Sequence, residues 1–119
     1  MAAPTDRCNG IALDTANLLA GHVVAAATAF LDGRHDAARL TEDAQRLQAK
    51  LLGFDDPATN PILQPARLIT VAMMGMAKAS VAAATDGAAV WRLERWEQVT
   101  RALVDLVRFE SRQLREHRT

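Results

Sequence analysis

The chain has 119 residues, of which half are apolar, and its 14 basic side chains balance its 14 acidic ones. This length is typical of a single domain, and the balanced charge provides no overall field that would attract nucleic acid or an anionic membrane. A single cysteine, Cys8, excludes an internal disulfide framework and a cysteine-based zinc site. The N-terminal residues lack the basic and apolar segments of a secretion signal. We therefore expect a reduced, cytoplasmic protein, and the excess of arginine over lysine together with abundant alanine indicates a bacterial source.

Apolar residues recur at helical spacing along the chain, and no stretch shows the sustained alternation of a strand. Glycine and proline separate four helical segments. The sequence predicts one all-α domain over residues 1–119, a four-helix antiparallel bundle with helices at about 11–31, 36–52, 65–84 and 88–117. We interpret the proline-rich connection, 53–65, as a rigid spacer.

The first predicted helix, 11–31, is apolar on most of its circumference. One face holds Ile11, Leu18, Leu19, His22, Val23, Ala26 and Phe30, and a second stripe holds Leu13, Ala20, Val24 and Leu31. A helix of this kind is buried on more than one side. Because His22 falls within the first face, we interpret it as a core histidine.

The second predicted helix, 36–52, has one narrow apolar stripe. Its members are Leu40, Ala44, Leu47 and Leu51. The remaining surface carries charged side chains that we expect to be solvated: Arg39, Glu42, Asp43, Arg46 and Lys50.

The third predicted helix, 65–84, contains the methionine-rich stretch LITVAMMGMAKA. Its uncharged run covers ten residues, 68–77, whereas a membrane span needs about 20 apolar residues, so we do not expect a membrane helix. Met73, Met74 and Met76 point in three directions, which indicates core filling rather than a binding groove. Small residues form a strip that favours close helix packing: Ala72, Gly75, Ala79 and Ala82.

The fourth predicted helix, 88–117, is about 45 Å long, so its last two turns should protrude or pair with another chain. Its main apolar stripe holds Ala89, Trp96, Val99, Leu103, Leu106, Val107 and Leu114. Trp91 lies off this stripe and shares a second strip with Ala102 and Phe109. Large aromatic residues are enriched at the energetic centres of interfaces, so this strip indicates binding to a partner.

The sequence offers little chemistry for catalysis. No glycine-rich phosphate loop and no pair of metal-binding E-x-x-H motifs occur, and we expect no metal and no cofactor. Arg112 and His117 have an R-x4-H spacing that resembles the catalytic signature of HEPN-type RNases, and this resemblance implies RNA cleavage at that pair. Gln113 follows Arg112 where that signature has an apolar residue. The arginine-rich C-terminal segment also carries acidic residues, so a nucleic-acid partner is not expected.

These observations favour a non-catalytic regulator that acts through protein–protein contact, such as an anti-activator that sequesters a transcription factor, an immunity protein or an adaptor. We expect a homodimer with a further protein partner. The predicted partner-binding residues are Trp91, Phe109, Leu13, Val24 and Leu31. One alternative is an apolar small-molecule site between the first and third helices near His22, Met73 and Met76. The other is the RNase implied by Arg112 and His117.

Overall fold

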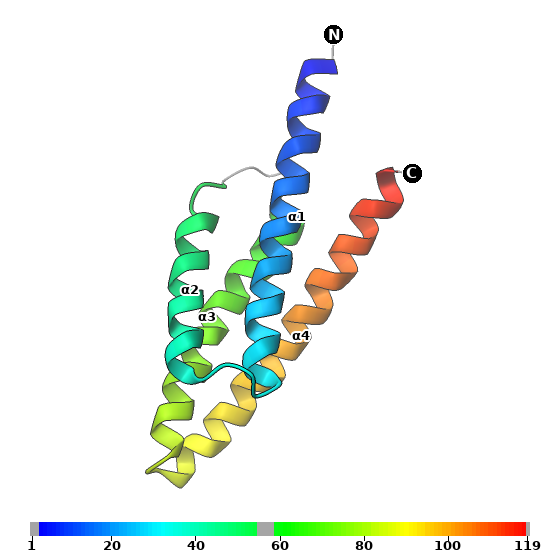
Figure 1. The fold of residues 1–119 in the computed structure, drawn as a ribbon. Helices are drawn as coiled ribbons and strands as arrows, with labels where there is room; N and C mark the ends of the chain where they lie inside the picture. The colour runs from blue at the N-terminus through cyan, green and yellow to red at the C-terminus, as the bar shows by residue number, and fades with distance from the viewer. Residues whose placement is uncertain (1–2, 55–58, 119) are drawn as a thin grey trace.

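A computed structural model describes residues 3–54 and 59–118, with side chains for 13–54, 59 and 61–116. It contains four helices, α1 (Ala3–Leu31), α2 (Ala37–Leu51), α3 (Asn60–Ala83) and α4 (Gly87–Arg118), and no strand within these described ranges (Figure 1). The all-α prediction is confirmed. Part of the predicted proline-rich connection, residues 55–58, lies outside the described residues.

Local signals in the sequence account for several helix ends. Gly33 adopts φ 76°, a left-handed conformation that glycine tolerates, and follows the end of α1; the amide of Arg34 donates to the carbonyl of Ala29 at 2.8 Å. At the start of α2, the Asp36 carboxylate accepts a hydrogen bond from the amide of Arg39 at 2.9 Å. The Asp86 carboxylate likewise accepts one from the amide of Ala88 at the start of α4, at 3.0 Å. These bonds satisfy amide groups that have no partner inside a first helical turn.

Helix α3 begins at Asn60, so part of the predicted spacer is helical. Pro61 lies in the first turn, where its missing amide hydrogen costs nothing, because the first amides of a helix have no intrahelical acceptor. Pro65 lies inside the helix and removes one backbone bond, but its side chain is buried. Helical geometry therefore continues through prolines that we interpreted as helix boundaries.

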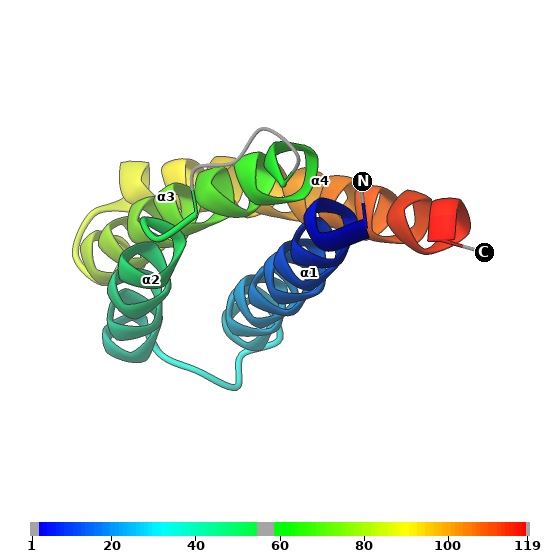
Figure 2. The same cartoon turned by 90° about the horizontal axis from the view of Figure 1, so that it is seen from above.

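The central element of the fold is α3, which packs against each of the other three helices. Helix α4 packs mainly along α3, whereas α2 and α4 share no close backbone contact within the described ranges. Seen from above, α1 and α2 lie on the same side of the layer formed by α3 and α4, and they diverge from one another (Figure 2). The molecule is elongated, with extents of 62 × 24 × 22 Å.

The core forms where α1, α2 and α3 meet. Its largest fully buried side chains include Leu40, Leu47, Leu63, Ile69, Met73, Met76 and Val23. Alanines of α1 at positions 16, 20 and 27 are also fully buried, so α1 approaches its neighbours closely.

Among the described residues, one helix, over Pro61–Ala83, is long and apolar enough to cross a membrane by length and composition, with a mean hydropathy of 1.3 in its most apolar window. Helix α3 has all three other helices as packing partners, and 44% of that window is buried. The core helix of a soluble protein can pass the same test, so this finding alone is weak evidence for a membrane span.

A side chain of α3 holds the end of α2. The guanidinium Nη2 of Arg67 donates to the carbonyl of Leu51 at 3.3 Å and also to the carbonyl of Phe54. Carbonyls at the C-terminus of a helix lack intrahelical donors and lie at the negative end of its dipole, so a cation is favoured there. Arg67 therefore fixes the end of α2 against the central helix.

The structure corrects three expectations about which side chains are buried. His22 is exposed, and so is Leu18, because α1 turns its alanines and Val23 toward the core. Asp43, expected in solvent, is buried. Val99 and Leu106 of the predicted main stripe of α4 are exposed, whereas Thr100, Val104 and Val107 face the core.

Candidate interaction surfaces

Helix α4 presents a stripe of exposed apolar side chains, which we call the α4 seam: Trp91, Val99, Ala102, Leu106 and Phe109. The exposed fraction is 59% for Trp91 and 44–46% for Val99, Leu106 and Phe109. From Val99 to Phe109 the members are spaced by three, four and three residues, which is the spacing of a helix–helix seam in coiled coils. The seam therefore has the pattern of a packed surface but has no partner within the described chain.

The N-terminal end of the seam is ordered by a cation–π contact. The guanidinium carbon of Arg95 lies 4.7 Å from the centroid of the Trp91 ring. Such contacts contribute about 0.5–1 kcal/mol at exposed sites. Trp91 thus keeps its indole on the surface, with an arginine beside it, a combination enriched at the energetic centres of protein interfaces.

The C-terminal end of the seam adjoins α1. Leu13 and Phe109 both line a hollow of about 370 Å³ together with Ile62 and Leu114. Nearby, the hydroxyl of Ser111 donates to the Asn17 amide oxygen at 2.5 Å and ties α4 to α1. The structure thus brings together two of the predicted partner-binding residues, Leu13 and Phe109.

The other predicted partner-binding residues lie apart from this hollow. Trp91 is 18 residues before Phe109 on the same helix, a distance of about 27 Å. Leu31 and Val24 are half-buried and pack against the core. Leu31 lines a hollow beside Arg101, and Val24 lines the surface between α1 and α2.

A second surface is the groove between α1 and α2, with a volume of about 640 Å³, which we call the α1–α2 groove. Its α1 side is lined by small residues, including Gly21, Ala25 and Thr28. Its other side is strongly basic and includes Arg34, Arg39, Arg46 and Lys50. Among the described residues that line the groove, Asp43 is the only carboxylate.

Asp43 organises the basic side of the groove. Its side chain is only 5% exposed, and its Oδ1 accepts hydrogen bonds from Nε of Arg39 at 3.2 Å and Nη2 of Arg46 at 3.0 Å. Nδ1 of His35 lies 3.6 Å from the Asp43 Oδ2 atom and has no hydrogen-bond partner. A buried carboxylate is stable only when such partners compensate its charge.

Sequence reasoning missed this groove, although its spacing was visible. Residues 39, 43, 46 and 50 follow a four, three, four pattern and therefore share one face of α2. From the sequence we expected the charged side chains on that face to be solvated. The divergence of α1 from α2, which forms the groove, depends on tertiary packing. The groove could be recognised only once both helices were placed.

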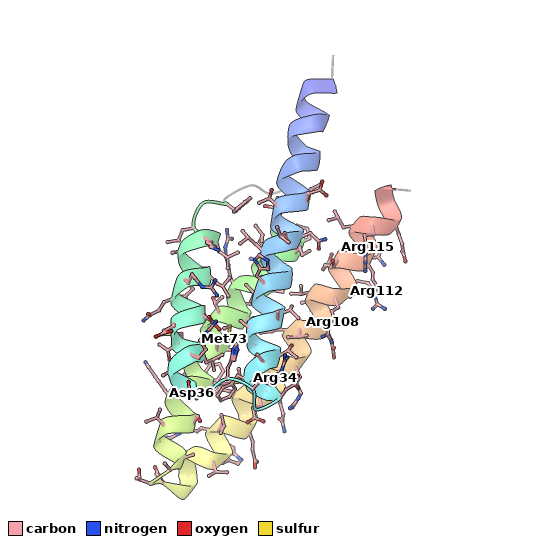
Figure 3. The ribbon with its side chains drawn as sticks, viewed as in Figure 1. Arg34, Asp36, Met73, Arg108, Arg112 and Arg115 are labelled. Atoms are coloured by element: carbon pink, nitrogen blue, oxygen red, sulfur yellow. The ribbon has the colours of Figure 1, made fainter. Side chains whose placement is uncertain are left out.

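Arginines also follow one side of the C-terminal half of α4. Arg108, Arg112 and Arg115 line a hollow of about 480 Å³ and lie one above another along the helix (Figure 3). Arg112, half of the R-x4-H pair, is exposed, and the side chain of His117 lies outside the described residues. RNA cleavage by this pair remains the implication of the sequence resemblance alone.

The small-residue strip of α3 faces α4 at its centre. Ala72 and Ala79 are buried, and Gly75 lies against the indole of Trp96. Beside this contact, Gly75, Ala79 and Ala82 line a hollow of about 450 Å³. The strip therefore accommodates a large side chain of α4.

The residues of the alternative small-molecule site differ in burial. His22 is exposed and lines the α1–α2 groove, whereas Met73 and Met76 are fully buried in the core. The hydroxyl of Thr100 donates to the carbonyl of Trp96 at 2.8 Å and lies 3.5 Å from the sulfur of Met76. Met76 thus fills the interior where α3 meets α4.

Two further findings bear on the class of protein. Within the described part of the chain, no group of three or more His, Cys, Asp or Glu side chains is arranged to hold a metal ion. Comparison with known proteins gave no significant match to a family model, a curated protein or a solved structure. The geometry of the two surfaces is therefore the basis for a functional proposal.

Proposed function

We propose that this protein is a non-catalytic interaction protein that assembles as a homodimer through the α4 seam and binds a further protein chain. The observation that carries the proposal is the exposure of the seam. Large apolar side chains that line up at coiled-coil spacing on a surface mark a site of association. The net charge of zero does little to oppose such pairing.

In this proposal each chain is an antiparallel four-helix unit in which α1 and α2 splay apart. The seams of two chains pack against one another, with Leu106 and Phe109 as the contacts of the C-terminal half. The hollow beside Phe109 and Leu13 offers space for an apolar side chain of the second copy. Trp91 extends the contact toward the other end of α4.

The second copy leaves the α1–α2 groove free, because the groove and the seam involve different helix faces. The dimer therefore presents two grooves to other proteins. A small regulator that sequesters a transcription factor, an immunity protein or an adaptor fits this arrangement. On its composition we place it in the bacterial cytoplasm.

The experiment is the solution mass of a double variant, Leu106→Glu with Phe109→Glu, measured by light scattering. Carboxylates in the C-terminal half of the seam would have to be desolvated within the interface, so the dimer should dissociate. Val81→Glu is the matched control, because Val81 is an exposed valine on α3 outside the seam.

The proposal expects the double variant to be monomeric with the helicity of the parent, and the control to remain dimeric. A double variant with the same mass as the parent would show that the seam is not the interface. A parent chain that is itself monomeric would contradict the homodimer.

A further inference from the structure

The two walls of the α1–α2 groove differ in chemistry. On α1, Gly21, Ala25 and Thr28 follow one another at four- and three-residue spacing, over about 10 Å. On α2, the basic residues extend from Arg39 to Lys50, over about 16 Å. The groove is therefore elongated, with a row of small side chains facing a row of cations.

The basic wall is held in place before any ligand arrives. Arg39 and Arg46 each use part of the guanidinium group to bind Asp43, and both side chains are 56% exposed. A guanidinium has five N–H donors, so most of them remain available to another acceptor. The conformational entropy lost on binding is smaller for side chains that are already ordered.

The opposite wall permits a close approach. A Cβ atom placed on Gly21 would meet no other atom within 4 Å, so the surface of α1 is open there. Small residues allow a neighbouring helix to approach to the lower end of the roughly 8–10 Å range of interaxial distances. A helix lying in the groove could therefore contact α1 through small or apolar side chains.

The positive charge of the groove favours acidic residues on another side of the bound helix. Arg34 and Lys50 have no carboxylate partner among the lining residues. Arg34 contacts Asp32, an exposed residue beside the groove, at 3.4 Å. Arg108 of α4 adds a further cation to the lining. The cations are spread over helical turns rather than converging on one point, which suits a row of carboxylates better than a single small anion.

We propose that the α1–α2 groove binds an amphipathic helix of a partner protein that carries acidic residues along one side and small or apolar residues along the adjoining side. This inference rests on the proposed interaction function and names the chemistry of the partner segment. The acidic row faces Arg39, Arg46 and Lys50, and the small-residue row faces Gly21 and Ala25. Helix-in-groove recognition of this kind uses anchors spaced by three and four residues.

The probe is a fluorescein-labelled helical peptide of about five turns. Glutamate occupies one stripe at alternating three- and four-residue spacing, and leucine and alanine occupy the adjoining stripe. The control peptide has lysine in place of glutamate. Fluorescence anisotropy on the full-length protein measures both affinities across a series of salt concentrations.

Two variants alter the groove without touching the core. Lys50→Glu reverses one exposed charge, and Ala25→Phe fills the groove from the α1 side. Lys78→Glu is the matched control, because Lys78 is an exposed lysine on α3 that does not line the groove. Circular dichroism verifies that each variant keeps the helicity of the parent.

The proposal predicts saturable binding of the glutamate peptide that weakens with salt and is weakened about tenfold or more by each groove variant. Lys78→Glu should bind as the parent does, and the lysine peptide should not bind. Absence of saturable binding, or equal loss in Lys50→Glu and Lys78→Glu, would overturn the proposal. Binding of a duplex RNA that Lys50→Glu abolishes, with no binding of the peptide, would assign the groove to nucleic acid instead.

The peptide experiment is separable from the test of the dimer. If the peptide fails to bind while the parent is dimeric and the seam variant monomeric, only the assignment of the groove is lost. If the peptide binds to a chain that is monomeric, the result supports the assignment of the groove and contradicts the proposed homodimer.

Discussion

The indole of Trp96 lies against the bare backbone of Gly75, where α4 crosses the centre of α3. A Cβ atom placed on Gly75 would lie 2.7 Å from Cδ2 and 2.8 Å from Cζ2 of Trp96, closer than side-chain carbons ordinarily approach. The absence of a side chain at Gly75 therefore sets the distance between the two most extensively packed helices.

Gly75→Ala should lower the free energy of unfolding by about 1–3 kcal/mol, because the rigid indole must move to admit even one methyl group. This loss should outweigh the gain of up to about 1 kcal/mol in helix propensity that alanine brings. Urea unfolding followed by circular dichroism measures the change.

The matched control is Gly21→Ala. Gly21 is exposed within α1, and nothing lies within 4 Å of its Cβ position, so this substitution should stabilise the protein by about 0.5–1 kcal/mol. Equal shifts in both variants would show that Trp96 does not constrain Gly75.

Asp43→Asn should destabilise the fold by about 1–2 kcal/mol, because it removes the charge that receives hydrogen bonds from Arg39 and Arg46. Water hydrates the half-exposed guanidinium groups in the variant, which keeps the cost at this modest level. Glu42→Gln is the control, since Glu42 is the exposed neighbour on the same helix. An unfolding midpoint that is the same in both variants would contradict the anchoring role of Asp43.

Arg67→Met should lower the free energy of unfolding by about 1–2 kcal/mol, because the carbonyls of Leu51 and Phe54 lose a charged donor while the apolar stem is retained. Amide hydrogen exchange near the end of α2 should accelerate more than exchange in α4. Lys78→Met, an exposed change on the same helix, should leave both measurements near those of the parent. Unchanged exchange at the end of α2 would count against the capping contact.

Trp91 fluorescence should report the association of α4 seams. The chain contains two tryptophans, of which Trp91 is 59% exposed in one copy and Trp96 is packed on Gly75. Dilution through the dissociation range should shift the emission to longer wavelength and increase quenching by acrylamide, because Trp91 becomes hydrated. Trp91→Phe should remove most of this dependence on concentration, and a parent spectrum that does not change as the dimer dissociates would place Trp91 outside the interface.

Much of the secondary structure was predictable because it depends on local chemistry. Gly33, Asp36 and Asp86 mark helix ends through a left-handed backbone or a carboxylate that accepts an amide hydrogen bond. The extension of α3 to Asn60 was not predicted, because proline is compatible with a first helical turn and the sequence does not reveal where that turn begins.

The orientation of the helices was less predictable, since it is decided by close packing of small residues. The sequence predicted that Leu18 and His22 lie on a buried face of the first helix. The fold instead buries the alanines at 16, 20 and 27 and leaves Leu18 62% exposed. In α4 the burial of Thr100 depends on its hydroxyl reaching the carbonyl of Trp96. Such choices depend on the neighbouring helix and not on the periodicity of one segment.

The candidate surface residues also differ in how far they could be predicted from one helix alone. The second strip of α4, with Trp91, Ala102 and Phe109, was visible from helical spacing, and the structure adds Val99 and Leu106 to it. The α1–α2 groove was not visible, because it depends on how α1 and α2 are placed relative to one another. The burial of Asp43 was missed for the same reason.

The most direct test of the account is the solution mass of the unmodified chain, measured by light scattering from micromolar down to nanomolar concentration. Pairing through the α4 seam predicts twice the mass of the chain at micromolar concentration, with dissociation to a single chain only on dilution. A single-chain mass throughout this range would contradict pairing through the α4 seam and leave its exposed apolar side chains without the proposed role.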